Sequence, residues 1–297
     1  MNKNDENIER GPDFEADGLY AQIVREEWTA SSTIEAWRRW YDKMVIQTRP
    51  LTQAILDLAE LKPGLRVLDL ASGTGEPALS IAKGIAPDGH VTATDLSPEL
   101  LQIAEQNAQQ MGLSNISFQQ ADVHQLPFAD ESFDRATCRV GVMYFWDCQR
   151  ALKEILRALK PNGVAAFVAW GPAEQSPFVT FFLGPFMKRK ALPELPPDAP
   201  HPMRFAAPGS LSSELSRAGF RSVVEETRIG ELAWPGPPKE LWQHVYEIAV
   251  PMQPYFDSFS VEERESAIGE VIAEFNKHWD GTYTRAQGAI NIASGIR

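Results

Sequence analysis

The sequence predicts an α/β protein in which a mostly parallel sheet carries helices on both of its faces. Short apolar segments alternate with amphipathic ones between residues 65 and 170. This pattern implies parallel strands joined by helical crossovers. The first apolar segment runs into a turn with Gly73 and Gly75 and then Pro77, the order expected of a strand, a tight turn and a helix start. Residues 164–170 are nearly all apolar, as a strand covered on both faces requires.

Two helices are expected before the sheet. Residues 1–18 are polar and acidic, which favours a frayed tail. Ser32 and Glu35 have the spacing of a capping box, and apolar residues recur with the period of a helix over 34–45, so an amphipathic helix is predicted there. A second helix is expected over 51–61, before a turn that contains proline and glycine.

Seven strands are predicted, and the last is expected to close the sheet as an edge strand. They cover residues 65–70, 90–94, 116–119, 133–138, 164–170, 220–227 and 289–296. Ser97, and Ser260 together with Glu263, have the pattern of helix N-terminal caps. These segments predict a Rossmann-like, doubly wound sheet of seven strands, mostly parallel with its last strand antiparallel, plus helical lid or cover segments. The helices are expected at 77–83, 97–112, 151–159 and 210–219, with two more within 238–277.

Composition and charge narrow the class of protein. The chain has 28 basic and 40 acidic residues, a net charge of −12, which disfavours non-specific binding to the phosphates of nucleic acids. It has no apolar run of about 18 residues, so no membrane span is expected, and no signal peptide is expected at the N-terminus. Cys138 and Cys148 form neither a disulfide framework nor a metal-ligand pattern. We therefore expect a cytoplasmic protein without a metal site.

Acidic residues gather where ligands bind in such a sheet, at the carboxyl ends of its parallel strands. Asp69 and Glu76 flank the glycine turn, Asp95 ends the second strand, and Asp122 follows the third. Residues 73–78 fit the loose G-x-G-x-x-G/A pattern of dinucleotide sites, so NAD is one candidate ligand. Glu76, however, would place a negative charge beside a pyrophosphate at the helix start. The acids favour a cationic ligand without phosphates.

The segment from residue 65 to 170 resembles the class I S-adenosylmethionine-dependent methyltransferases. The sequence Val-Leu-Asp-Leu-Ala-Ser-Gly-Thr-Gly-Glu at 67–76 resembles their first motif, and Thr-Asp-Leu-Ser at 94–97 their second. Blocks similar to later motifs lie at 121–134 and 159–163. Within that family the pattern is similar to that of the ubiquinone/menaquinone C-methyltransferases and related small-molecule enzymes. Ala71 departs from the pattern, because many members have glycine there, and we expect only a slightly tighter approach of the backbone to the cofactor.

The resemblance implies S-adenosylmethionine as the cofactor and a role for each matching residue. Asp69 and the backbone near Ala71 would serve the ammonium group of the methionine, and the side chain or the backbone of Arg139 would reach its carboxylate. Asp95 would accept hydrogen bonds from the ribose hydroxyls, and Asp122 one from the adenine amine. The other implied cofactor contacts are Ser72, Gly73, Gly75, Leu96 and Val123.

The same interpretation divides the chain into four parts. Residues 1–50 are assigned to a tail and helical cover, and residues 51–170 to the cofactor-binding core. Residues 171–209, which are rich in proline and aromatic residues, are assigned to a substrate cover. Residues 210–297 are assigned to the last strands of the sheet, with helices inserted at 238–278.

The methyl acceptor is expected to be a small aromatic or lipidic molecule. The chain lacks the Asn/Asp-Pro-Pro-Tyr run that the family uses for amino groups of bases or glutamine. Side chains that could line an apolar pocket are Trp40, Tyr41, Met143, Tyr144, Trp146, Trp170, Phe178 and Phe182. Since the cofactor supplies the leaving group, a general base is needed only for a protonated nucleophile, and the weak candidates are His124, Tyr144 and His201. An NAD-dependent oxidoreductase and a non-catalytic binding module are the alternatives.

Overall fold

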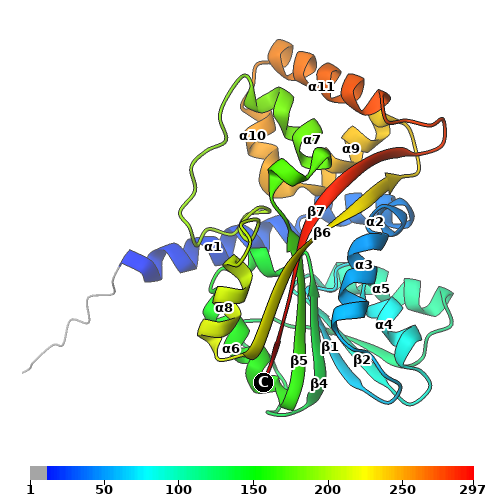
Figure 1. Ribbon diagram of the computed structural model, residues 1–297, viewed down its shortest axis with the longest axis vertical. Helices are drawn as coiled ribbons and strands as arrows, with labels where there is room; N and C mark the ends of the chain where they lie inside the picture. Colours follow the sequence, from blue (N-terminus) through cyan, green and yellow to red (C-terminus); the bar gives the residue numbers. More distant parts are fainter. Residues whose placement is uncertain (1–11) are drawn as a thin grey trace, which may run out of the picture.

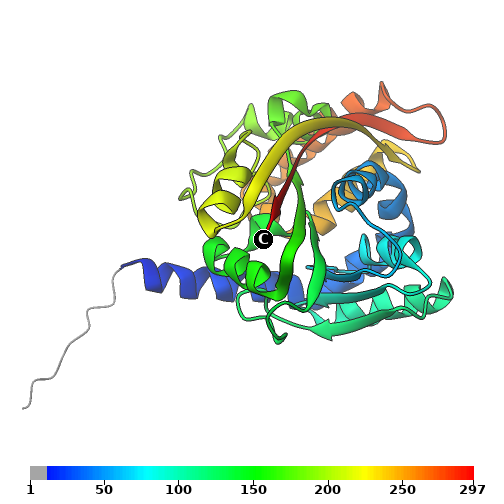
Figure 2. The same ribbon diagram turned by 60° about the horizontal axis from the view of Figure 1, so that its bottom comes forward.

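The structure, a computed structural model, describes residues 12–297 (Figure 1). The part of the predicted tail at 1–11 lies outside the described residues. The rest of it, 12–18, is helical, because it belongs to α1 (Pro12–Thr29). This helix was not predicted from the sequence, and its first turns project from the body of the molecule (Figure 1, Figure 2).

Two predicted helices follow α1 and precede the sheet, α2 (Ser31–Gln47) and α3 (Arg49–Leu58). The predicted capping box at Ser32 is wrong. Ala30 occupies the N-cap of α2 and makes no side-chain hydrogen bond, so the helix begins one residue before Ser32 and is held by the packing of its apolar face.

Seven strands form one sheet in the order β3-β2-β1-β4-β5-β7-β6 (Figure 1). The pairs β3-β2, β2-β1, β1-β4 and β4-β5 are parallel, and β7 is antiparallel to both of its neighbours, which confirms the predicted fold class. The strands are β1 (Arg66–Leu70), β2 (His90–Asp95), β3 (Ile116–Gln120), β4 (Phe133–Arg139), β5 (Leu159–Trp170), β6 (Arg221–Trp234) and β7 (Thr284–Ile296).

The position of β7 corrects the prediction of a final edge strand. β7 lies between β5 and β6, and β6 is the edge. Residues 288–295 of β7 are buried without interruption, whereas most of β6 is exposed or half-buried. A strand that is buried on both faces belongs inside a sheet, and the more exposed strand is left at its border.

Helices cover both faces of the sheet (Figure 2). Val67 of β1 packs with α4 (Ala78–Ile85), whereas Leu68 and Leu70 pack with α6 (Cys148–Ala158) and α8 (Ser210–Ala218). Since successive residues of a strand point to opposite faces, α4 lies on one face and the pair α6 and α8 on the other. The helix α5 (Pro98–Gln110) packs against β2 and β3.

β6 and β7 continue as a two-stranded ribbon beyond the end of β5. Trp170 of β5 pairs with Ile290, but the pairing of β6 with β7 continues to Trp234 and Thr284. Helices gather around this ribbon (Figure 1), and their apolar side chains share one core with it. They are α2, α7 (Pro177–Met187), α9 (Pro238–Ile248), α10 (Gln253–Asp257) and α11 (Val261–Asn276).

Two of the predicted caps are present. The Ser97 hydroxyl accepts a hydrogen bond from the Leu100 N–H at the start of α5, at 3.3 Å. Ser260 and Glu263 form the capping box of α11. Short 3₁₀ helices lie in three connections, η1 (Val142–Tyr144), η2 (Ala173–Gln175) and η3 (Val250–Met252).

Candidate active site

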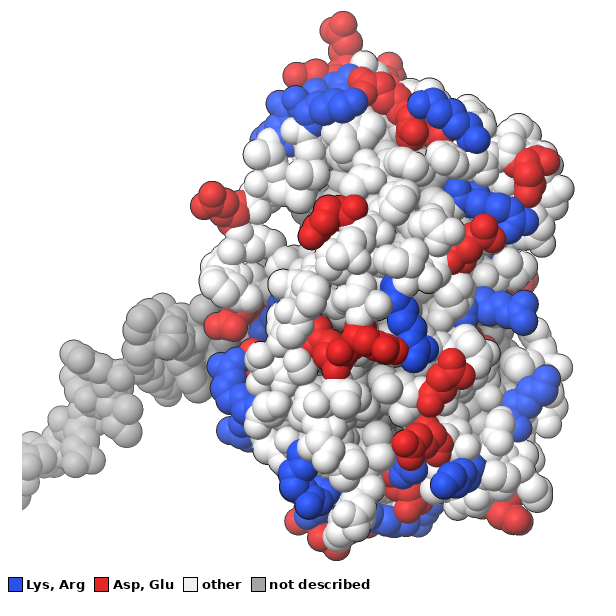
Figure 3. All heavy atoms as spheres, viewed as in Figure 1, with Lys and Arg blue, Asp and Glu red and all other residues white. Residues whose placement is uncertain are grey.

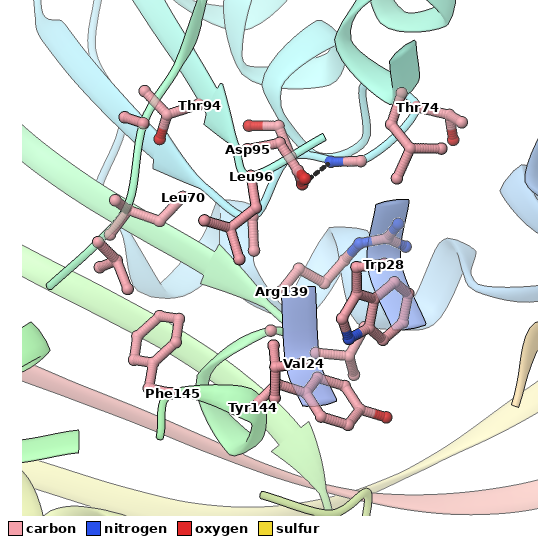
Figure 4. A pocket seen from close by; sticks show the side chains of 18 of the residues that line it. Val24, Trp28, Leu70, Thr74, Thr94, Asp95, Leu96, Arg139, Tyr144 and Phe145 are labelled. Carbon is pink, nitrogen blue, oxygen red and sulfur yellow. Dashed lines mark hydrogen bonds between the residues drawn. The ribbon is translucent and has the colours of Figure 1, made fainter. Parts of the chain in front are cut away.

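The turn after β1 has a backbone that favours glycine. Gly73 and Gly75 have φ angles of +52° and +120°, and Ala71 has +52°, in the left-handed region where a side chain is costly. The end of β2 holds this turn in place. The carboxylate of Asp95 accepts a hydrogen bond from the Gly73 N–H at 2.8 Å (Figure 4). It accepts a second from the Ser97 N–H at 2.9 Å.

Gly141, in the loop after β4, accommodates the methyl group of Ala71. A Cβ placed on Gly141 would lie 2.6 Å from Cβ of Ala71 and 2.9 Å from Sγ of Cys138, well inside the ~3.5–4.0 Å separation of carbon atoms in contact. Alanine at position 71 therefore requires glycine at position 141. The methyl group of Ala71 faces this loop, an orientation that was not predicted from the sequence.

A cavity of about 880 Å³, partly open to solvent, lies at the glycine turn, and we call it the turn cavity (Figure 4). Three of the predicted cofactor residues, Asp69, Gly75 and Asp122, do not line it. Those that do are Ala71, Ser72, Gly73, Asp95, Leu96, Val123 and Arg139.

Asp69 lies behind the turn and not in the wall of the cavity. It is fully buried and accepts hydrogen bonds from the hydroxyls of Ser72 and Thr137. Burial raises the pKa of Asp69 to about 7, although these two hydrogen bonds oppose the rise. The carboxyl group therefore fixes the glycine turn to β4. Gly75 is also structural, because a Cβ there would lie 2.6 Å from Cδ1 of Leu79.

Asp122 is engaged by protein groups. Its carboxylate accepts hydrogen bonds from Nη2 of Arg25 at 2.7 Å, and from Nδ1 and the backbone N–H of His124 at 2.7 and 2.9 Å. Burial raises the pKa of Asp122, but the hydrogen bonds outweigh it and lower the pKa to about 2. Asp122 therefore ties α1 to the loop after β3.

His124 lines the turn cavity, but both of its ring nitrogens are occupied. Nδ1 donates to Asp122, and Nε2 accepts a hydrogen bond from the Asp147 N–H at 3.3 Å. The ring also stacks on Trp146, with centroids 3.8 Å apart. This geometry gives His124 a structural role and does not favour it as a general base.

Arg139 and Glu76 line the turn cavity, and each has an unpaired polar atom. Arg139 donates to Oγ1 of Thr48 at 2.7 Å and to the Glu76 carbonyl at 3.1 Å. Nε of Arg139 and Oε2 of Glu76 are buried without a hydrogen-bond partner among residues 12–297. One free cationic donor and one free acidic acceptor match the carboxylate and ammonium groups of an amino acid. The residues present therefore fit the methionine part of S-adenosylmethionine.

The helix α1 supplies a wall of the turn cavity that the sequence analysis missed. Val24 and Trp28 line the cavity, together with Trp37 of α2 (Figure 4). The ring of Trp28 meets that of Trp37 edge-on, with centroids 5.8 Å apart, and lies 5.1 Å from that of Tyr144. A signal was available, since Tyr20, Val24 and Trp28 recur at the four-residue spacing of one helix face.

A second, larger cavity adjoins the first, and we call it the helical chamber. It has a volume of about 2470 Å³, partly open to solvent, and lies among α1, α2, α7, α9 and the segment 192–203. The two cavities share wall residues, among them Trp28, Trp37, Glu76, Arg139 and Tyr144. The predicted acceptor-pocket and base candidates that line the chamber are Tyr41, Tyr144, Trp170, Phe178, Phe182 and His201.

Three predicted pocket residues do not line the helical chamber. Trp40 packs edge-on against Trp234, with centroids 5.6 Å apart, and its indole N–H donates to Glu247 at 2.7 Å. Met143 is fully buried in the core beneath β1 and β5. Trp146 lines the turn cavity instead. These positions arise because packing with distant elements selects which side of a helix or turn reaches a cavity.

The fold and the site together define the class of protein. A seven-stranded sheet of this topology, with a glycine turn after β1 and an acid at the end of β2, is the cofactor-binding framework that the first and second motifs predicted. A family model described as a methyltransferase domain matches residues 61–176. The chain belongs to the class I S-adenosylmethionine-dependent methyltransferases, whose cofactor is S-adenosylmethionine.

Individual relatives refine this assignment. The chain is 35% identical over 190 residues to the demethylmenaquinone methyltransferase of Thermus thermophilus, covering 60% of this chain and 84% of the relative. It is 41% identical over 121 residues to the 2-phytyl-1,4-naphtoquinone methyltransferase of a Nostoc species, covering 40% of this chain and 53% of the relative. The chain spans about half the length of the first curated relatives it matches.

A solved structure supports the fold. The YcgJ protein of Bacillus subtilis aligns with a TM-score of 0.53 at 22% identity, covering 84% of this chain and 98% of that one. In the part of the chain that the structure describes, no helix has the length and apolar character to cross a membrane. Nor do residues 12–297 bring three or more His, Cys, Asp or Glu side chains together as metal ligands. On the face shown in Figure 3, acidic and basic side chains are interspersed.

Proposed function

We propose that this chain is an enzyme that transfers a methyl group from S-adenosylmethionine to a small aromatic or lipidic acceptor held in the helical chamber. The observation that carries the proposal is the wall shared by the two cavities. The turn cavity has polar groups suited to the cofactor, and the helical chamber is mostly apolar. Methyl transfer requires the two reactants to be held in line at such a junction.

The proposed cofactor contacts use the free polar atoms of the turn cavity. Arg139 and Glu76 would hold the carboxylate and ammonium groups, and Asp95, whose two oxygens each have a further acceptor site, would take the ribose hydroxyls. Leu96 and Val123 would pack against the adenine. When bound, S-adenosylmethionine supplies an electrophilic methyl group and its own leaving group.

The contribution of the chain itself would be alignment and the exclusion of water. Trp28, Trp37 and Tyr144 border both cavities, so they separate the junction from solvent on the side of α1. Aromatic faces also attract cations, which favours a sulfonium group at this place. Closing the junction strengthens the electrostatic interactions within it, because they act in a medium of lower dielectric constant.

Two groups in the helical chamber could take a proton from an acceptor hydroxyl. Burial raises the pKa of Glu27 on α1 to about 7, so this carboxyl group exchanges its proton near neutral pH. Burial lowers the pKa of His201, as does the charge of Arg204, so the imidazole is neutral at pH 7. Tyr144 is less suited, since burial and the charge of Glu27 raise its pKa and keep it protonated.

Calorimetric titration with S-adenosylmethionine, S-adenosylhomocysteine and NADH tests the cofactor assignment. We expect the first two to bind and NADH not to bind. Asp95→Ala should weaken binding by about 1–3 kcal/mol, because the ribose hydroxyls lose their acceptor. Glu105→Ala, which removes an exposed acid from α5, is the matched control and should bind as the parent does. Tight binding of NADH alone would support an oxidoreductase instead.

The acceptor class is tested by mass spectrometry of reaction mixtures. Reduced naphthoquinones with side chains of several lengths, simple phenols and aliphatic amines are each incubated with the protein and S-adenosylmethionine. We expect a methylated product and S-adenosylhomocysteine with members of the first two groups. Product formed only from the amines would contradict an aromatic or lipidic acceptor, and no product from any acceptor, despite cofactor binding, would favour a binding module.

A further inference from the structure

Two buried polar side chains face each other in the wall of the helical chamber. Gln47 ends α2 and is 4% exposed, and His244 lies in α9 and is fully buried. Nε2 of His244 lies 3.2 Å from Oε1 of Gln47. Nδ1 of His244 and Nε2 of Gln47 have no hydrogen-bond partner in the described part of the chain. Both residues line the chamber.

The surroundings fix the imidazole and keep it neutral. The ring of His244 stacks on Trp234, with centroids 4.2 Å apart, and meets the ring of Trp40 edge-on at 5.7 Å. Burial lowers the pKa of His244 to about 3, so at pH 7 one ring nitrogen is a donor and the other an acceptor. Gln47 Oε1 accepts from Nε2, which leaves Nδ1 of His244 as a free acceptor and the amide N–H groups of Gln47 as free donors.

The pair presents one donor and one acceptor whichever way the amide of Gln47 is turned. In the opposite orientation the amide nitrogen would donate to Nε2 of His244. Nδ1 would then carry the proton, and the amide oxygen would be the free acceptor. A ligand group that can either donate or accept a hydrogen bond can therefore pair with a free atom of either side chain in both arrangements.

The unpaired atoms have no structural explanation in the surrounding wall. Buried polar groups are nearly always hydrogen-bonded, because burial without a partner costs free energy. Neighbouring residues of the same wall, Met44, Leu232 and Val245, are apolar and cannot supply a partner. A role in ligand recognition accounts for a polar pair kept in such surroundings.

We infer that Gln47 and His244 form a subsite that recognises a hydroxyl group of the methyl acceptor, an inference that rests on the proposed function. A hydroxyl can donate a hydrogen bond or accept one, so it can pair with the free atom of Gln47 or with that of His244 in either arrangement. Thr48, next in the chain to Gln47, accepts the hydrogen bond of Arg139, so the subsite is close to the junction of the two cavities. An acceptor bound there is oriented by its hydroxyl group while its apolar body lies in the chamber.

The test compares 2-naphthol with 2-methylnaphthalene, which has a methyl group in place of the hydroxyl. Each probe is titrated calorimetrically into the parent protein and into His244→Phe, Gln47→Met and the double variant, with and without S-adenosylhomocysteine. We expect the parent to prefer 2-naphthol by about tenfold, the value of one hydrogen bond to a buried group. The preference should be lost in the double variant and reduced in the single variants, while the affinity for S-adenosylhomocysteine stays that of the parent.

Tyr255→Phe is the matched control. Tyr255 lines the same chamber, but its hydroxyl already donates to the carbonyl oxygen of Lys190 at 2.6 Å, so its removal should leave the preference for 2-naphthol intact. The double variant removes both partners together and leaves no unpaired polar atom of the pair. It therefore replaces a single variant in the test if that variant does not fold.

The outcomes separate the inference from the proposed function. A parent protein that shows no preference for 2-naphthol, or variants that keep the preference, would overturn the subsite. A parent that prefers 2-naphthol but binds neither S-adenosylmethionine nor S-adenosylhomocysteine would overturn the proposed function and leave the polar pair as a hydroxyl-binding site.

Discussion

Replacing Gly141 with alanine should destabilise the protein chiefly through one neighbour, the methyl group of Ala71. The added Cβ would lie 2.6 Å from Cβ of Ala71 and 2.9 Å from Sγ of Cys138. Ala71→Gly removes the first of these contacts and leaves the second. The effect of Gly141→Ala should therefore be much smaller in the Ala71→Gly background than in the parent.

The magnitudes follow from the geometry of the turn. A methyl group forced into a packed site costs about 1–3 kcal/mol, and we expect Gly141→Ala to lie in the upper half of that range. Ala71→Gly relieves an alanine in the left-handed region, which stabilises the protein by about 1–2 kcal/mol. The greater freedom of glycine in the unfolded chain costs about 0.5–1 kcal/mol, so the substitution alone should be neutral or stabilise by up to about 1.5 kcal/mol. The coupling between the two substitutions should then be about 1–2 kcal/mol.

Denaturant unfolding of the parent, both single variants and the double variant measures this coupling. Gly269→Ala in α11 is the control, because a Cβ there meets nothing within 4 Å, and it should stabilise the helix by about 0.5–1 kcal/mol. If the effects of the two substitutions add to within about 0.5 kcal/mol, the steric argument that pairs Ala71 with Gly141 is wrong.

Other predictions concern the cofactor and α1. Glu76→Gln should weaken S-adenosylmethionine binding about tenfold or more while leaving the fold intact, because the ammonium group loses a charged acceptor; calorimetry at two salt concentrations checks this. Arg25→Ala should change stability by no more than about 1 kcal/mol, since the ion pair with Asp122 is partly exposed, but should speed release of S-adenosylhomocysteine, measured by stopped-flow tryptophan fluorescence. The pKa of Glu27 in the folded state, about 7, exceeds the ordinary value of 4.5 for a glutamate, so the folded state holds this proton more tightly. Stability relative to Glu27→Gln should therefore fall as pH rises from about 4.5 to about 7, and equal pH profiles of the two denaturation midpoints would contradict it.

The sheet was predictable because its signals are local. A strand, a glycine turn and a helix start are each encoded within a few residues, as at residues 67–78, and their repetition implies the parallel topology. The position of β7 between β5 and β6 was not predictable in this way, because the neighbours of a strand depend on contacts between distant segments. Only the uninterrupted burial of 288–295 shows why it lies inside the sheet.

The residue types of the candidate site were predicted better than the contacts that these residues make. Asp95 meets the glycine turn where the motifs place it, whereas the carboxylates of Asp69 and Asp122 are occupied by protein donors. Their partners Thr137 and Arg25 are separated from them by 68 and 97 residues of chain, and no local pattern announces such pairs. The wall supplied by α1 was not predicted. The polar residues at the start of the chain indicated a tail, so the apolar face of this helix was not recognised.

The ribbon of β6 and β7 has a consequence for how such a protein can diversify. The glycine turn is built by β1 and β2, whereas much of the helical chamber is built by helices that pack on the ribbon beyond the end of β5. Substitutions in that outer layer can reshape the chamber without moving the strand ends that hold the cofactor turn. Selection, or a designer, could therefore exchange the helices on the ribbon as a module and retain the cofactor machinery.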